Sequence, residues 1–168
     1  MSDRSTVTPS GSGASTAAPD LSIAQANGAD REWAAQLMVR SEPWTTLRRP
    51  LEACRAVLND PEFQIFVSRT RGERSGFLVL DPRGMAGAPY LKSVAIAPEF
   101  RGSGLGSRLL AFAEEHVRPR ARHLFLCVSS FNDRARQLYE RVGYQPVGSV
   151  QDLAIEGASE LIMFKRLR

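Results

Sequence analysis

The sequence has little cysteine, no long apolar run and no leader-like N-terminus. Only two cysteines occur among its 168 residues, Cys54 and Cys127. They lie far apart, so neither a disulfide framework nor a thiolate metal site is indicated. No stretch approaches the roughly 20 consecutive apolar residues of a membrane span, and no basic segment precedes an apolar run as in a secretory signal. We therefore expect a cytoplasmic protein with no metal and no membrane partner.

The positive charge also lacks a pattern. The chain carries a net charge of +4 and has a pI near 9.6, which taken alone favours a nucleic-acid partner. However, its basic residues are spread along the chain and interleaved with acids, so no basic helix or stripe stands out. We expect no nucleic-acid partner. A basic nucleic-acid module remains a distinct alternative, and steep salt dependence of DNA or RNA binding would reveal it.

Composition divides the chain into a tail and one domain. Residues 1–18 are almost entirely small and polar, so they bury too little apolar surface to offset the entropy of ordering, and we expect a flexible tail. The whole chain is 43% hydrophobic and 24% charged, as in a globular protein. We expect residues 19–168 to form a single domain.

Hydrophobic periodicity, glycines and prolines predict an alternation of strands and helices. Asp30 stands where a helix cap would lie, and Pro43 ends that helix. Residues 82–89 have the glycine and proline content of a loop. The predicted order is a strand near 19–26, helices from 30 to about 41 and over 50–58, strands at 63–69, 75–81 and 90–97, a helix at 105–117, a strand at 123–128, a helix at 132–142, and strands at 144–150 and 160–167.

A glycine-rich loop connects the strand at 90–97 to the helix that follows it. Three glycines fall at alternate positions in RGSGLG, residues 101–106, where they permit positive φ angles and close approach of a ligand to the backbone. The first N–H groups of the following helix are unpaired and its positive dipole end faces the loop, so an anionic group is the natural ligand. Two phosphate-binding motifs fail. Ser107-Arg108 replaces the Lys-Ser/Thr of a P-loop, and the next strand ends in Ser129-Ser130 rather than the acid of a dinucleotide site.

The pattern Arg101-x-x-Gly104-x-Gly106, after VAIAPEF, resembles the pyrophosphate loop Q/R-x-x-G-x-G/A of the GNAT superfamily of acyl-CoA N-acyltransferases. SSFNDRARQLYERVGY, residues 129–144, resembles the family's second cofactor segment. The resemblance covers about residues 20–167. It implies a mixed α/β (α+β) fold with a splayed central sheet of about six or seven strands flanked by about four helices. It also implies acetyl-CoA as the co-substrate.

The resemblance also implies roles for particular residues. The phenol of Tyr139, with a pKa near 10, would protonate or hydrogen-bond the departing thiolate, whose conjugate-acid pKa is near 8.5. The backbone N–H near Ile96 would polarise the thioester carbonyl. Taken alone, Tyr139 also fits an ordinary core tyrosine, and Asn132 also fits a helix N-cap. The implied cofactor-binding residues are Val94, Ala95, Ile96, Arg101, Gly102, Ser103, Gly104, Leu105, Gly106, Ser107, Asn132 and Tyr139.

The general base and the acceptor site remain open at this point. Glu42 and Trp44 would border the acceptor site, although a helix-ending turn with a packed Trp is the favoured explanation for these two residues. Tyr90 is another candidate, and an ordered water could relay the proton. Cys127 fits a core thiol. In some relatives that acetylate ribosomal protein N-termini a Glu occupies its position, so Cys127 argues against that substrate.

These observations predict an N-acetyltransferase that moves an acetyl group from acetyl-CoA to a primary amine by direct attack in a ternary complex. The acceptor would be a small molecule or a protein, and the enzyme a monomer or a homodimer. The alternative is a non-catalytic acyl-CoA-binding or regulatory module, because a shared fold does not guarantee shared chemistry.

Overall fold

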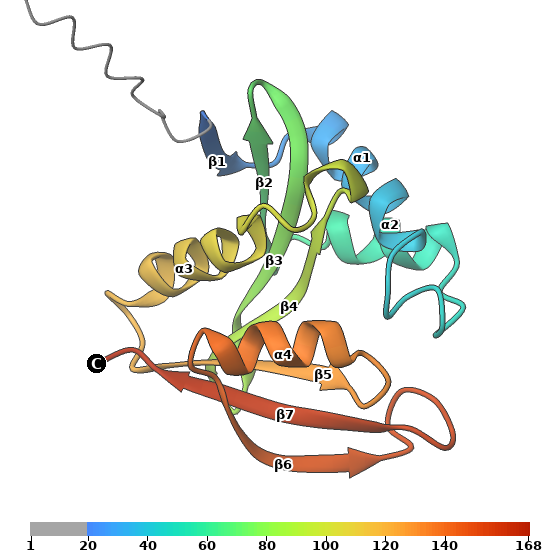
Figure 1. Ribbon diagram of the computed structural model, residues 1–168, viewed down its shortest axis with the longest axis vertical. Helices are drawn as coiled ribbons and strands as arrows, with labels where there is room; N and C mark the ends of the chain where they lie inside the picture. The colour runs from blue at the N-terminus through green and yellow to red at the C-terminus, as the bar shows by residue number, and fades with distance from the viewer. Residues whose placement is uncertain (1–19) are drawn as a thin grey trace, which may run out of the picture.

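The computed structural model describes residues 20–168, and the predicted tail, residues 1–18, lies outside them. Seven strands form one sheet in the order β1-β2-β3-β4-β5-β7-β6, and the elements follow the predicted order (Figure 1). The elements are β1 (Leu21–Gln25), α1 (Gly28–Val39), α2 (Leu51–Asn59), β2 (Gln64–Thr70), β3 (Glu73–Met85), β4 (Ala88–Ile96), the 3-10 turn η1 (Pro98–Phe100), α3 (Leu105–Val117), β5 (His123–Ser129), α4 (Asp133–Arg141), β6 (Gln145–Gln151) and β7 (Ser159–Arg166).

The sheet is mixed and splayed at its middle, as predicted. Strands β1 to β4 are antiparallel neighbours, and so are β5, β7 and β6. The two halves join through the parallel pair β4–β5, whose register holds only Tyr90 opposite Phe125 and Leu91 opposite Leu126. Beyond these pairs β4 and β5 diverge (Figure 1). Within residues 20–168, the β4 edge at residues 93–96 is therefore left without a neighbouring strand on that side.

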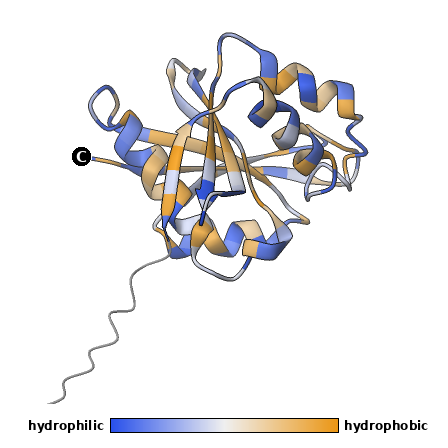
Figure 2. Cartoon of the chain, turned by 90° about the horizontal axis from the view of Figure 1, so that it is seen from above, coloured by the Kyte–Doolittle hydropathy of each residue, from blue (hydrophilic) through white to orange (hydrophobic). Residues whose placement is uncertain are grey.

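Side-chain alternation along β3 supplies both faces of the core. Phe77 and Val79 are buried against α1 and α2, whereas Leu78 and Leu80 are buried against α3 and the second half of the sheet. A strand that is buried on both faces is expected to be a continuous apolar run. Hydrophobic residues accordingly follow the central strands, and hydrophilic ones lie on the outer helix faces (Figure 2).

The start of α1 differs from the prediction. The cap is Asn27, whose side chain accepts a bond from the Asp30 backbone N–H, while the Asp30 carboxylate accepts a bond from the Asn27 backbone N–H. Asp30 therefore stands at the third helical position, as in a capping box. Its carboxylate is buried and also pairs with Arg69 at 2.6 Å and Arg74 at 2.7 Å. The ion pairs depend on a strand register that a local pattern does not reveal.

The predicted loop at 82–89 is also wrong in part. Strand β3 continues to Met85 and β4 begins at Ala88, and these two residues pair across the hairpin. Ala86 and Gly87 form its turn with positive φ angles of 50° and 83°, as a tight two-residue hairpin requires. Pro82 and Gly84 are tolerated because this end of the hairpin is exposed.

No helix within residues 20–168 has the length and apolar character needed to cross a membrane.

Candidate active site

The glycine loop forms a turn that ends in α3. Gly102 and Gly104 have φ angles of 78° and 79°, and Gly104 is the N-cap of α3 without a side-chain cap bond. A Cβ at Gly104 would meet nothing within 4 Å, so the left-handed backbone, rather than crowding, favours glycine there. Arg101 Nε donates to the Ile96 carbonyl at 3.1 Å, and Ser103 Oγ donates to the Phe100 carbonyl at 2.6 Å. The first bond ties the loop to the end of β4, and the second ties it to η1.

The loop presents a series of free backbone N–H groups. Within the described chain, the first helical bond of α3 runs from Arg108 N to Gly104 O at 3.2 Å, and the amides of residues 102–107 have no backbone acceptor. Unpaired amides at the positive end of a helix dipole bind anions. The structure thus presents unpaired amides in this loop, and the binding of an anion by them stays a prediction.

A cavity of about 830 Å³, the larger cavity, lies between this loop, the free edge of β4 and the start of α4. Four arginines, Arg40, Arg101, Arg134 and Arg141, line it, against two carboxylates, Glu42 and Asp133. Only Arg101 was predicted among these arginines. The other predicted cofactor-binding residues that line the larger cavity are Val94, Ala95, Ile96, Gly102, Gly104, Leu105, Gly106, Ser107, Asn132 and Tyr139. Ser103 does not line it, because its side chain turns back to Phe100.

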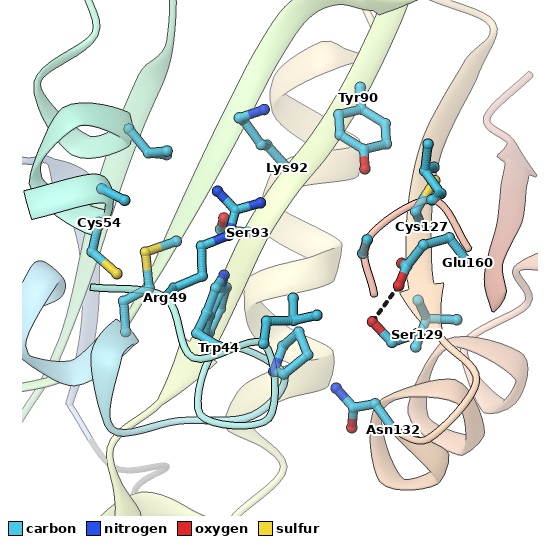
Figure 3. A pocket seen from close by; sticks show the side chains of 18 of the residues that line it. Trp44, Arg49, Cys54, Tyr90, Lys92, Ser93, Cys127, Ser129, Asn132 and Glu160 are labelled. Atoms are coloured by element: carbon cyan, nitrogen blue, oxygen red, sulfur yellow. Dashed lines mark hydrogen bonds between the residues drawn. The ribbon is translucent and has the colours of Figure 1, made fainter. Parts of the chain in front are cut away.

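A second cavity of about 320 Å³, the smaller cavity, lies between α2, the first part of β4 and β5 (Figure 3). The predicted acceptor-side residues Trp44 and Tyr90 both line it. Trp44 is buried, with its ring 6.3 Å from the Phe77 ring, so it packs in the core and forms a cavity wall at once. Glu42 lines the larger cavity instead, where its carboxylate accepts a 2.5 Å bond from Thr45. That hydrogen bond lowers the pKa of Glu42, which weakens it as a base.

The two cavities meet at Asn132 and Tyr139, which line both. Asn132 Oδ1 accepts a 3.3 Å bond from the Ala135 N–H and so caps α4, as predicted. Tyr139 belongs to the buried core and faces both cavities. Burial raises the pKa of Tyr139 to about 12, which keeps the phenol protonated at neutral pH. Packing of Tyr139 in the core and a position of Tyr139 at the junction of the two cavities are therefore not mutually exclusive.

Sequence reasoning missed a carboxylate in the smaller cavity. Glu160, near the start of β7, lines the cavity and accepts a 2.5 Å bond from Ser129 Oγ (Figure 3). It pairs in register with Ser129 across β5 and β7, so only knowledge of that register would have placed it here. Cys127 also lines the cavity and is half-buried, rather than a fully enclosed core thiol. Burial raises the pKa of both Cys127 and Tyr90, so both side chains are neutral at neutral pH.

Comparisons with known proteins agree with this geometry. A family model described as "Acetyltransferase (GNAT) family" matches residues 29–144. The chain is 34% identical over 103 residues to a "5-NmdU N-acetyltransferase" of Pseudomonas phage PaMx11, covering 60% of this chain and 67% of that protein. It is 30% identical over 120 residues to the "N-alpha-acetyltransferase RimI" of Mycobacterium tuberculosis, covering 70% and 71% of the two chains.

A solved structure of an aminoglycoside 6'-N-acetyltransferase complexed with coenzyme A superposes with a TM-score of 0.70. The match covers 87% of this chain and 97% of that one at 17% identity. At that identity the likeness shows a common fold and leaves the acceptor open.

Proposed function

The chain belongs to the acetyltransferase (GNAT) family and is an acyl-CoA-dependent acyltransferase, and from that premise we propose that it transfers an acetyl group from acetyl-CoA to a primary amine by direct attack in a ternary complex. The observation that carries the proposal is that a basic larger cavity and a separate smaller cavity meet at Tyr139 and Asn132. Such a junction lets a thioester and an amine approach each other from opposite sides. Residues 19–168 would act as one catalytic domain.

The larger cavity suits coenzyme A along its whole length. The free β4 edge at Val94 to Ile96 offers backbone groups to the amides of the pantetheine arm, as one strand does to another. The unpaired amides of residues 102–107 receive the pyrophosphate. Ser103 contributes through its backbone N–H and through the turn that its hydroxyl holds. The lining arginines supply charge for the remaining phosphate.

The transfer requires one bond to form and one to break. The neutral amine attacks the thioester carbon to form the C–N bond, while the backbone N–H near Ile96 stabilises the developing oxyanion. The C–S bond then breaks, the Tyr139 phenol gives its proton to the departing thiolate, and the proton lost by the attacking nitrogen reprotonates the Tyr139 phenolate. From the neutral amine, the products are the amide and the free CoA thiol.

The acceptor is a primary amine of a small molecule or a protein. The names of the two relatives give 5-NmdU as the acceptor for one and an α-nitrogen for the other, so they agree on the reaction and differ on the acceptor. A cavity of about 320 Å³ is at the small end of ligand sites. It holds a small amine or the end of a longer chain.

Tyr139→Phe tests the proposal because it removes only the hydroxyl. The kcat for amine-dependent release of CoA thiol should fall by about 10²- to 10⁴-fold, while acetyl-CoA affinity should change less than about threefold. Tyr144→Phe is the matched control: its ring lies 6.0 Å from the Tyr139 ring, it lines neither cavity, and its buried hydroxyl has no partner within residues 20–168. Parent-like kcat in Tyr139→Phe would return this residue to a purely packing role.

A further inference from the structure

Three charged side chains line the smaller cavity and do not neutralise one another: Arg49, Lys92 and Glu160. Within residues 20–168, neither Arg49 nor Lys92 forms an ion pair with a carboxylate, whereas the surface residue Arg55 pairs with Glu32 at 2.7 Å. The cavity therefore holds one more positive than negative charge. Arg49 and Lys92 are exposed and Glu160 is partly buried, so all three charged groups keep hydrogen-bonding capacity for a ligand in the cavity.

The two cations belong to the wall formed by β4 and the segment before α2. Ser93 is in register with Val79 and Leu91 with Leu80, which leaves Lys92 as the extra residue of a β-bulge. A bulge redirects its side chain, and here Lys92 Nζ lies 5.0 Å from the centroid of the Phe63 ring. Arg49 immediately precedes the N-cap of α2. Figure 3 shows its guanidinium extending from the Trp44 side of the pocket toward Ser93.

The carboxylate lies on the opposite wall. Figure 3 shows Glu160 directed into the pocket from β7, beside Cys127 and across from Arg49. The hydrogen bond from Ser129 Oγ fixes one end of the carboxylate. Glu160 has no cationic partner within the described part of the chain, so its remaining acceptor capacity is available to a ligand in the cavity.

We propose that the acceptor is a primary amine that also carries an anionic group, a carboxylate or a phosphate, with its ammonium directed to Glu160 and its anion directed to Arg49 and Lys92. This inference rests on the proposed acetyl transfer. A simple alkylamine would bring a further positive charge into a cavity that already has a positive excess, whereas an amino acid or an amino phosphate brings a partner for each wall. Glu160 receives the proton that the ammonium loses before attack.

Paired acceptors test the charge requirement through CoA thiol release. The carboxylate arm compares γ-aminobutyrate with its amide and phenylalanine with its amide, and the phosphate arm compares phosphoethanolamine with ethanolamine. In at least one pair, the acceptor that carries the anionic group should have a kcat/KM about 10- to 100-fold higher than the partner that lacks this group. This ratio is the worth of a hydrogen bond between charged groups. The arm that responds identifies the anion.

Charge-removing variants then locate the recognition. Arg49→Gln and Lys92→Gln should each lower kcat/KM about 10-fold or more for the anionic acceptor and leave its neutral partner within about threefold. Glu160→Gln should lower both members of a pair, since both carry the amine. Matched controls are Arg48→Gln and Glu156→Gln, whose side chains are exposed and line neither cavity. The shift in melting temperature caused by acetyl-CoA should persist in every variant.

The outcomes separate this inference from the acetyl transfer. Turnover of neutral amines that equals or exceeds that of their anionic partners overturns the inference and leaves acetyl transfer intact. Equal loss for both members of a pair in Arg49→Gln and Lys92→Gln shows a structural role and also overturns it. Absence of thiol release with every amine, while acetyl-CoA still raises the melting temperature, overturns the proposed function itself.

Discussion

Replacing Gly104 by aspartate would place a carboxylate at the N-terminus of α3, beside the amides proposed to receive the pyrophosphate. Gly104 has a φ angle of 79° and open space around the position of a Cβ, so the new side chain fits without a clash. The left-handed backbone costs about 1–2 kcal/mol for a residue other than glycine, and less for Asp or Asn, which tolerate it. Gly104→Asn carries the same backbone cost without the charge, and is the matched control.

The size of the effect follows from the charge. Two like charges roughly 5 Å apart repel by about 3 kcal/mol at an effective dielectric constant near 20, which weakens binding by about 100-fold. A ligand present at about 100 times its Kd stabilises the folded protein by about 2.7 kcal/mol, and after a 100-fold weakening it stabilises by about 0.4 kcal/mol. For a chain of this length these values correspond to shifts in melting temperature of about 5–11 °C and about 1–2 °C.

Thermal unfolding with and without acetyl-CoA measures both shifts. We expect Gly104→Asn to keep most of the parent shift and Gly104→Asp to lose most of it. If the two variants fold and show equal, parent-like shifts, the pyrophosphate does not lie at these amides and the assignment of the loop is wrong.

Three further predictions concern the surroundings of the site. Asn132→Ala should lower the melting temperature by about 2–4 °C, because the cap bond to α4 is worth about 1 kcal/mol, whereas Asn132→Asp keeps a cap acceptor and should not. Asp30→Asn should lower the free energy of unfolding by about 2–4 kcal/mol at pH 7, measured with urea. Burial raises the pKa of Asp30, but bonds from Arg74, Asn27 and Arg69 outweigh it, so the pKa of this carboxyl is lowered on folding. The ionised carboxylate therefore stabilises the folded protein above the unfolded pKa. The difference in unfolding free energy between the parent and Asp30→Asn should shrink below about pH 4. Because burial raises the pKa of Tyr139 to about 12, deprotonation of this phenol should not lower kcat between about pH 8 and pH 10. A fall in kcat over that range in the parent, absent in Tyr139→Phe, would show that the phenol loses its proton there and would contradict this prediction.

Local patterns were sufficient for the order of the elements and for the conformation of the glycine loop, whereas the splayed mixed sheet was implied by the family resemblance. The order of strands and helices follows from hydrophobic periodicity, and Gly102 and Gly104 adopt the positive φ angles that their spacing suggested. Asn132 caps α4 as its position before the helix indicated. These features depend on residues that are close together in the sequence, so a single sequence contains the information.

The smaller cavity depends on contacts between distant segments. Glu160 reaches it through the register of β7 on β5, Lys92 through a bulge in the pairing of β3 with β4, and Arg49 through the placement of the segment before α2. No local pattern marks any of the three as a site residue. Glu42 shows the converse, because it was chosen for its position in the chain and lies in the other cavity.

The central claim is that the acetyl group passes directly from the thioester to an amine at the junction of the two cavities. Incubation with acetyl-CoA labelled in its acetyl group, together with the preferred amine, allows product and protein to be followed by mass spectrometry while free CoA thiol is measured. The account predicts labelled amide in equal amount to the released thiol, no labelled protein intermediate, and loss of both products in Tyr139→Phe. Label that appears as free acetate or on the protein, or bound acetyl-CoA that never releases thiol, would contradict it.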